Sequence, residues 1–234
     1  METLLKASIS GDLILASHAI NDGVRDFNEA MRNACEYGHI PIVKLLLEKD
    51  TRRSISYSTV RVTASHFGHT EIVKLLLNLG DDNHLYCLQV AAHYGHIDTV
   101  RLLLSNNSIY NYPLLRRHYN CVMESAALGG HIDIVLLSLE NQADSYNQTM
   151  IYAIQSGSKE IVQLMLSKGA DNYRDCLFHA SKSNNLDIAL LLLEKIHPDK
   201  FAYDLNMDNI IQYVGKDNEV LTLIRTFKEG KRKL

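Results

Sequence analysis

Apolar and polar positions follow one short pattern that returns along the chain. Its clearest copy runs from Ala91 to Leu104, where a short helical segment is followed by a turn at Gly95 and a second, leucine-rich segment. Apolar residues three and four positions apart mark one face of a helix, so each copy predicts two helices joined by a tight turn. A helix pair cannot bury its apolar face alone, and the pattern therefore predicts a stack of similar pairs.

A turn marker fixes the register of the copies. Successive markers are 27, 30, 27, 35, 27 and 27 residues apart, and an alanine stands four residues before each of them. The turn needs a positive φ, which glycine adopts freely and asparagine tolerates best among the other residues. The alanines predict close helix packing, where a larger side chain would cost about 1–3 kcal/mol. The markers are Gly11, Gly38, Gly68, Gly95, Gly130, Gly157 and Asn184, and the alanines are Ala7, Ala34, Ala64, Ala91, Ala126, Ala153 and Ala180.

These motifs resemble the ankyrin repeat. The matching features are the A-x-x-x-G-H turn, as at Ala64–His69, and the I-V-x-L-L-L helix, as at Ile72–Leu77. The resemblance implies an all-α, ankyrin-like helical repeat solenoid of about eight stacked helix pairs. We expect a single array over 1–228 and a basic tail over 229–234, with repeats at 1–24, 25–54, 55–81, 82–116, 117–143, 144–170, 171–200 and 204–228.

The chain departs from the ankyrin pattern in its spacing. Ankyrin repeats have a period of about 33 residues and a T-P-L-H signature, whereas most gaps here are 27 residues and no T-P-L-H occurs. The missing residues fall where an ankyrin β-finger stands, so we expect most fingers to be shortened to tight turns. Short-fingered arrays of this type look like the ankyrin proteins of large DNA viruses, and bacterial effectors are another place where they occur.

Three joints interrupt the rhythm, at 49–57, 105–120 and 196–206. The middle joint carries the most extra residues, and we predict a loop there with Tyr110, Tyr112, Arg116 and Arg117 as binding residues, since tyrosine and arginine are enriched at interface hot spots. The alternative is that Leu114 and Leu115 pack this segment onto the stack or extend a helix. After the last joint, the apolar positions at 210–224 predict an eighth, capping pair.

Composition excludes several classes of function. Net charge is −3, so no global basic field favours nucleic acid, and the scattered cysteines read as reduced thiols of an intracellular protein. No apolar run reaches the roughly 20 residues of a membrane helix, and no nucleotide-binding, hydrolase or metalloprotease motif occurs. We therefore expect no enzyme, no cofactor and no metal site. The histidines after the turn glycines predict hydrogen bonds to the backbone, with metal binding as the alternative.

The ankyrin resemblance implies protein binding through the concave surface of the first helices. By that resemblance the two residues before each turn glycine face the groove, and in the second to fourth repeats they are Glu36, Tyr37, His66, Phe67, His93 and Tyr94. We name Tyr37, Phe67 and Tyr94 the aromatic ridge and expect them to anchor the partner. The alternative is that each ring packs inside the stack.

The expected protein is a monomer that binds an intracellular protein, in the cytoplasm or the nucleus, and a host protein if the source is viral or an effector. Two other functions stay open: an adaptor that recruits a second protein through the 105–120 segment or the termini, and a nucleic-acid-associated factor. The second would need a basic stripe, but Arg52, Arg53, Arg116, Arg117 and the tail lie far apart in the chain.

Overall fold

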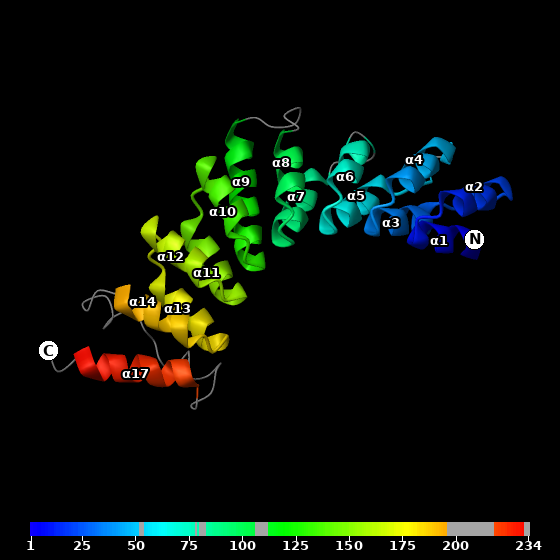
Figure 1. Ribbon diagram of the computed structural model, residues 1–234. Helices are drawn as coiled ribbons and strands as arrows, with labels where there is room; N and C mark the ends of the chain where they lie inside the picture. The colour runs from blue at the N-terminus through cyan, green and yellow to red at the C-terminus, as the bar shows by residue number, and fades with distance from the viewer. Residues whose placement is uncertain (52–53, 78, 80–82, 106–111, 196–217, 232–234) are drawn as a thin grey trace. The chain divides into compact units, whose positions relative to one another are not determined.

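The computed structural model describes residues 1–51, 54–77, 79, 83–105, 112–195 and 218–231. Every regular element in this part of the chain is a helix, which confirms the all-α prediction (Figure 1). The first eight helices are α1 (Glu2–Ser10), α2 (Leu13–Asn21), α3 (Asn28–Glu36), α4 (Ile40–Lys49), α5 (Tyr57–His66), α6 (Thr70–Leu76), α7 (His84–His93) and α8 (Ile97–Ser105). They are followed by α9 (Tyr112–Gly129), α10 (Ile132–Glu140), α11 (Tyr146–Ser156), α12 (Lys159–Ser167), α13 (Tyr173–Lys182), α14 (Leu186–Lys195) and α17 (Glu219–Lys231).

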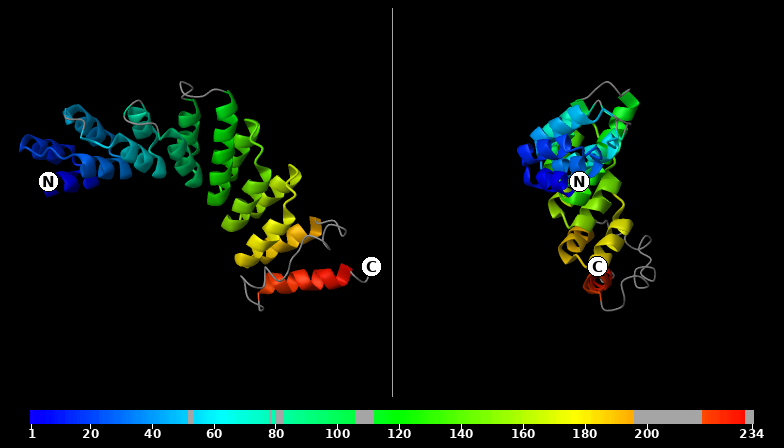
Figure 2. Two further views of the ribbon diagram at one scale, coloured as in Figure 1. Left: turned by 180° about the vertical axis from the view of Figure 1, so that it is seen from behind. Right: turned by 90° about the vertical axis from the view of Figure 1, so that its right-hand side faces the viewer.

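The chain divides into two compact units, unit 1 over Met1–His118 and unit 2 over Tyr119–Leu234. In unit 1 the first helices α1, α3, α5 and α7 pack side by side in one layer, and α2, α4, α6 and α8 form the second layer (Figures 1 and 2). In unit 2 the corresponding neighbours are α11 beside α13, and α10, α12 and α14 in series. The boundary between the two units follows His118 and lies inside the 105–120 joint. A single array over 1–228 therefore stays a prediction.

All seven turn markers have the predicted left-handed backbone. Their φ angles range from 51° at Asn184 to 82° at Gly130. In every copy the N–H of the residue after the marker donates to the carbonyl of the repeat's alanine, at 2.8–3.1 Å between nitrogen and oxygen. This bond closes the end of the first helix in the Schellman arrangement, which ties the alanine to the marker at a fixed spacing.

The alanines confirm the stacking register, because all seven are fully buried. Apolar residues four and five positions after the marker are also buried in the second to seventh repeats, for example Ile42 and Val43 in α4. The first repeat is different, since Leu15 at this position is 37% exposed. Thr99 holds the same position in the fourth repeat, and its hydroxyl bonds to Thr70 of the third repeat. The position therefore faces the preceding repeat, and Leu15 of the first repeat lacks such a neighbour.

The predicted loop over 105–120 is wrong for its second half. Residues from Tyr112 onward form the first turns of α9, and residues 106–111 lie outside the described part of the chain. Pro113 is the second residue of this helix, where a missing N–H removes no helical hydrogen bond. His118, Val122, Met123 and Ala126 follow at helical spacing and are buried, so the helix is held by its packing.

Short joints replace the fingers within the described residues. Five residues, 168–172, connect α12 to α13, and no strand occurs there or in the other described joints. At the end of the chain α17 packs on α13 and α14 with Val220, Leu221 and Ile224 buried, as expected for a cap. Its expected partner helix, with Ile210, Ile211 and Val214, lies outside the described residues.

Candidate protein-binding surface

The three rings of the aromatic ridge are exposed. Tyr37, Phe67 and Tyr94 are the C-cap residues of α3, α5 and α7, each directly before a turn glycine, and their exposed fractions are 50%, 42% and 46%. Because α3, α5 and α7 are neighbours in one layer of unit 1, equivalent positions on them form a row. The alternative that these rings are buried in the stack is therefore wrong.

His66 joins two rings of the ridge. Its imidazole stacks on Phe67, with ring centroids 4.6 Å apart and planes 9° apart, and on Tyr94 of the next repeat, at 4.0 Å and 19°. His93 meets Tyr94 edge to face at 4.9 Å. Aromatic pairs in these geometries add about 0.5–1.5 kcal/mol beyond the area that they bury. The side chains of two repeats therefore hold one another in place at the surface.

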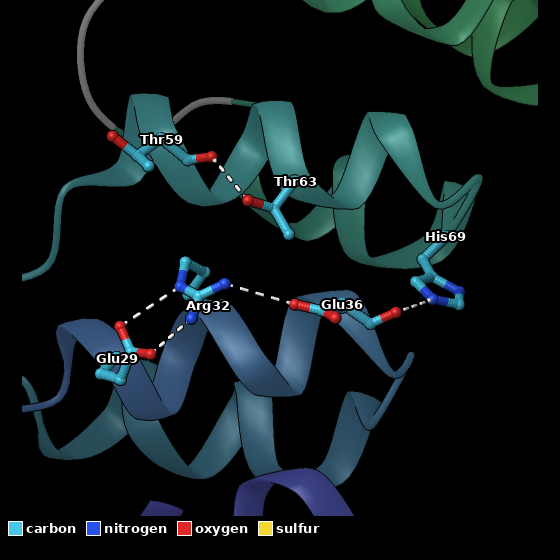
Figure 3. A network of polar contacts seen from close by, with 6 residues as sticks. All are labelled: Glu29, Arg32, Glu36, Thr59, Thr63 and His69. Carbon is cyan, nitrogen blue, oxygen red and sulfur yellow. Dashed lines mark hydrogen bonds and ion pairs between the residues drawn. The ribbon is translucent and has the colours of Figure 1, made fainter. Parts of the chain in front are cut away.

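Beside the ridge, α3 carries a network of three charged side chains. Arg32 lies between the carboxylates of Glu29 and Glu36, with 3.3 Å from its Nη1 to Glu36 Oε2 (Figure 3). The hydrogen bond from Arg32 lowers the pKa of Glu29, and the same bond raises the pKa of Arg32. All three side chains are partly exposed, so this is a solvated network with one carboxylate more than it has guanidinium groups.

Three histidines connect successive repeats of unit 1. The Nε2 atoms of His39, His69 and His96 donate to backbone carbonyls of the preceding repeat, at Ile9, Glu36 and His66, over 2.9, 2.9 and 2.7 Å. We name these three residues the histidine ladder. The prediction that they bond to backbone is confirmed, and no group of three metal-ligating side chains occurs among the residues that the structure describes.

The histidine ladder gives the turns that it covers a second reason for glycine, besides the positive φ. A Cβ atom placed on Gly38 would lie 2.7 Å from the ring of His69, and one on Gly68 would lie 2.4 Å from the ring of His96. The ring of each ladder residue thus covers the turn before it. Two of the carbonyls that accept these bonds belong to Glu36 and His66, so the ladder also fixes the backbone that carries the ridge.

The remaining predicted residues lie elsewhere. Arg116 and Arg117 are exposed on α9, whereas Tyr110 and the side chain of Tyr112 lie outside the described residues. Ring contacts join His66, Phe67, His93 and Tyr94, and an ion pair joins Glu36 to Arg32. Arg116 and Arg117 belong to another helix, α9.

Sequence reasoning missed exposed apolar residues on the same layer. Tyr86 of α7 is 58% exposed, and Ile9 of α1, two residues before Gly11, is 46% exposed. Ile9 occupies the same register position as Glu36 and His66. That shared position was a usable signal, because it places an exposed apolar residue next to Ser10, which is the ridge position of the first repeat.

The cysteines offer no nucleophile at this surface. Burial raises the pKa of Cys35 to about 12, and burial with a contribution from Asp175 raises the pKa of Cys176 to about 12 as well. Thiols of this kind are not ionised at neutral pH and are inert.

A comparison with protein families decides the identity of the repeat. The model of ankyrin repeats (3 copies) matches residues 31–114, 60–145 and 122–204. The chain belongs to the ankyrin repeat family. Ankyrin repeats generally serve as protein–protein interaction modules and are typically not enzymes.

No curated protein gives a match, and the expected likeness to ankyrin proteins of large DNA viruses has no support. No helix in the described part of the chain is long and apolar enough to cross a membrane.

Proposed function

We propose that this ankyrin repeat protein binds a protein partner through the aromatic ridge and its neighbours Glu36, His66 and His93. One observation carries the proposal: each of three successive first helices ends in a ring that is about half exposed. Aromatic residues with polar neighbours are typical of binding hot spots.

Preorganisation supports this assignment. The stacking of His66 on Phe67 and Tyr94 already restricts these side chains in the free protein. Ordering a side chain at an interface costs roughly 0.5–1.5 kcal/mol, and a restricted ring avoids much of that loss. The equivalent positions of unit 2 carry no aromatic residue, so the proposal concerns unit 1; they are Leu128, Gly129, Gln155, Ser156, Lys182 and Ser183.

Affinity capture with the Tyr37→Ala/Phe67→Ala/Tyr94→Ala variant tests the proposal. We expect the partner to be lost while the helical circular dichroism signal stays unchanged. The control is Leu128→Ala, which removes an exposed apolar side chain two residues before a marker of unit 2 and should leave capture intact. If the alanine variant unfolds, serine replaces alanine, because Ser10, Ser156 and Ser183 stand directly before the marker in other repeats. Capture that survives in a folded variant would refute the ridge.

A second candidate is an adaptor function through α9, favoured by the exposed Arg116 and Arg117. It predicts that Arg116→Ala/Arg117→Ala removes a second partner and leaves the ridge-dependent partner in place. The setting we propose is intracellular, in cytoplasm or nucleus, which the absence of a disulfide among the four cysteines supports. Binding of an oligonucleotide that weakens with salt would instead favour a nucleic-acid-associated function.

A further inference from the structure

The aromatic ridge has a regular spacing that a partner must match. Its rings sit at equivalent positions on α3, α5 and α7. Packed helices lie about 8–10 Å apart. A partner that crosses these helices therefore meets one exposed apolar group roughly every 8–10 Å.

A polyproline II segment has this period. It has three residues per turn and a rise of about 3.1 Å, so the same side of the segment returns about every 9.3 Å. An extended β-strand returns its side chains to one face every two residues, or about 6.6 Å, which does not match.

An α-helix matches only through every seventh residue, about 10.5 Å apart. Its residues at i+3 and i+4 would then need pockets between the rings. The imidazole of His66 fills the space between Phe67 and Tyr94, with 4.6 and 4.0 Å to the two ring centroids. A helix would therefore place side chains against a closed surface.

The surface also suits a backbone without internal hydrogen bonds. No strand edge occurs among the described residues, so a strand could not pair with this layer. The carbonyl groups of a polyproline II segment are free to accept, and the exposed phenols of Tyr37, Tyr86 and Tyr94 can donate to them.

The charged side chains of the first helices indicate where a charged residue of such a segment would lie. Among the exposed and partly exposed side chains on the first helices of unit 1, Glu2 is paired with Lys6, and the second carboxylate of the Glu29–Arg32–Glu36 network on α3 is the only described charge in excess. Arg61 of α5 is buried, and α7 has no Asp, Glu, Lys or Arg. A basic residue over α3 would complement this charge.

We propose that the ridge binds a proline-rich segment in the polyproline II conformation, with a lysine or arginine at the end that lies over α3. This inference rests on the proposed function, since it names the chemistry of the partner at the same surface. Tyrosine rings against prolines make the apolar contacts, and Glu29 and Glu36 pair with the basic residue.

A random library of displayed peptides of about 12 residues, which span about 37 Å as polyproline II, tests the inference. The library is selected on the full chain and counter-selected on the Tyr37→Ser/Phe67→Ser/Tyr94→Ser variant. We expect the ridge-dependent binders to share prolines three residues apart and a lysine or arginine near one end. Binders with an apolar seven-residue spacing, or no ridge-dependent binders, would overturn the inference.

Synthetic versions of the selected peptides then measure each contribution. We expect Tyr94→Ser to weaken binding at least about tenfold, which corresponds to about 1.4 kcal/mol. Glu36→Gln should weaken it about threefold, with no effect on a peptide whose basic residue is replaced by alanine. Glu71→Gln, on an exposed position of α6 in the second layer of unit 1, should leave binding unchanged. An equal response of the alanine-substituted peptide to Glu36→Gln would refute the charge pairing.

The two proposals fail separately. If lysate capture depends on the ridge but the selected peptides lack the proline spacing, the ridge is a protein-binding site and the polyproline inference is wrong. If neither capture nor peptide binding depends on the ridge, both proposals are wrong.

Discussion

The two units share their turns and their alanines but connect successive repeats with different side chains. In unit 1 the imidazoles of the histidine ladder cover the preceding turn and bond to its backbone. In unit 2 His131 follows the first marker, but Ser158 and Asn185 follow the next two, and the Ser156 hydroxyl donates to the Ala127 carbonyl over 2.7 Å. The turn thus accepts either a ring or a short polar group.

The two units also differ in the residues directly before their markers, where the proposed binding surface lies. Two rungs of the histidine ladder bond to Glu36 and His66, the residues directly before Tyr37 and Phe67. Unit 2 has serines directly before its markers at Ser156 and Ser183. The unit with the histidine ladder therefore carries the exposed rings, whereas the residues directly before the markers of unit 2 are Gly129, Ser156 and Ser183.

The shared alanines should give the largest effect, and the same effect in both units. Ala91 and Ala153 are fully buried, so Ala91→Leu and Ala153→Leu should each lower the free energy of unfolding by about 3 kcal/mol through overpacking. Urea unfolding followed by circular dichroism measures it. An effect well below about 1 kcal/mol at either site would show that the position has room and that the stacking register is wrong there.

Gly68 of unit 1 and Gly157 of unit 2 should respond differently to the same substitution. Gly68→Ala should cost about 2–3 kcal/mol, because a left-handed backbone costs about 1–2 kcal/mol for an L-residue and the new Cβ would displace the His96 ring. Gly157→Ala should cost about 1 kcal/mol, since its Cβ would meet only Asn185 at 3.7 Å.

A double-mutant cycle separates the clash from the backbone cost. Adding His96→Ala to Gly68→Ala should cost less than the sum of the single changes, because the clash is removed with the ring. If the two costs are additive, the His96 ring does not clash with a side chain at position 68.

Asp50 holds the joint between α4 and α5 in unit 1. Its carboxylate accepts from Ser54 N and Oγ, both at 2.8 Å, from Ile55 N at 3.1 Å and from the Tyr57 hydroxyl at 3.2 Å. Burial alone would raise the pKa of Asp50, but these hydrogen bonds outweigh it and lower the pKa. Asp50→Ala should therefore cost about 1–2 kcal/mol at neutral pH.

The sign of the pH dependence follows from the lowered pKa. The stabilisation by Asp50 is present above the unfolded pKa of about 3.9 and is lost as pH falls through the lower folded pKa. The difference between wild type and Asp50→Ala should thus shrink in acid, as measured by urea unfolding at several pH values. Glu48→Gln, at an exposed neighbouring site, is the control and should show no such change.

Much of the fold could be predicted from the sequence because steric demands limit the choices at a few positions. Glycine and asparagine suit a positive φ best, and only a small residue fits between stacked helices, so the markers and alanines defined the register correctly. At the start of α9 the predicted loop was wrong and the alternative of a helix extension holds, because the proline in the first turn, Pro113, is compatible with a helix.

The candidate site was harder to predict. Whether Tyr37, Phe67 and Tyr94 face solvent depends on the angle at which the next helix crosses, which the pattern of one repeat does not contain. The Asn28, Asn120 and Asn147 amides were missed altogether, although each stands ten residues before its marker. They bond to the entry of the next repeat and connect repeats where the fingers are shortened.

The asparagine bridges should have the smallest effect, and they occur in both units. Asn147 Oδ1 accepts from Asp171 N over 2.9 Å, and its Nδ2 donates to Asp171 Oδ1 over 3.2 Å. Because the side chain is exposed, water replaces part of the loss, and Asn147→Ala should cost about 0.5–1 kcal/mol. Hydrogen exchange of the Asp171 amide should accelerate locally, whereas Gln148→Ala on the exposed neighbouring position should leave it unchanged. Equal exchange in both variants would mean that the joint is held by α12 and α13 alone, and that the recurring asparagine does not substitute for the finger.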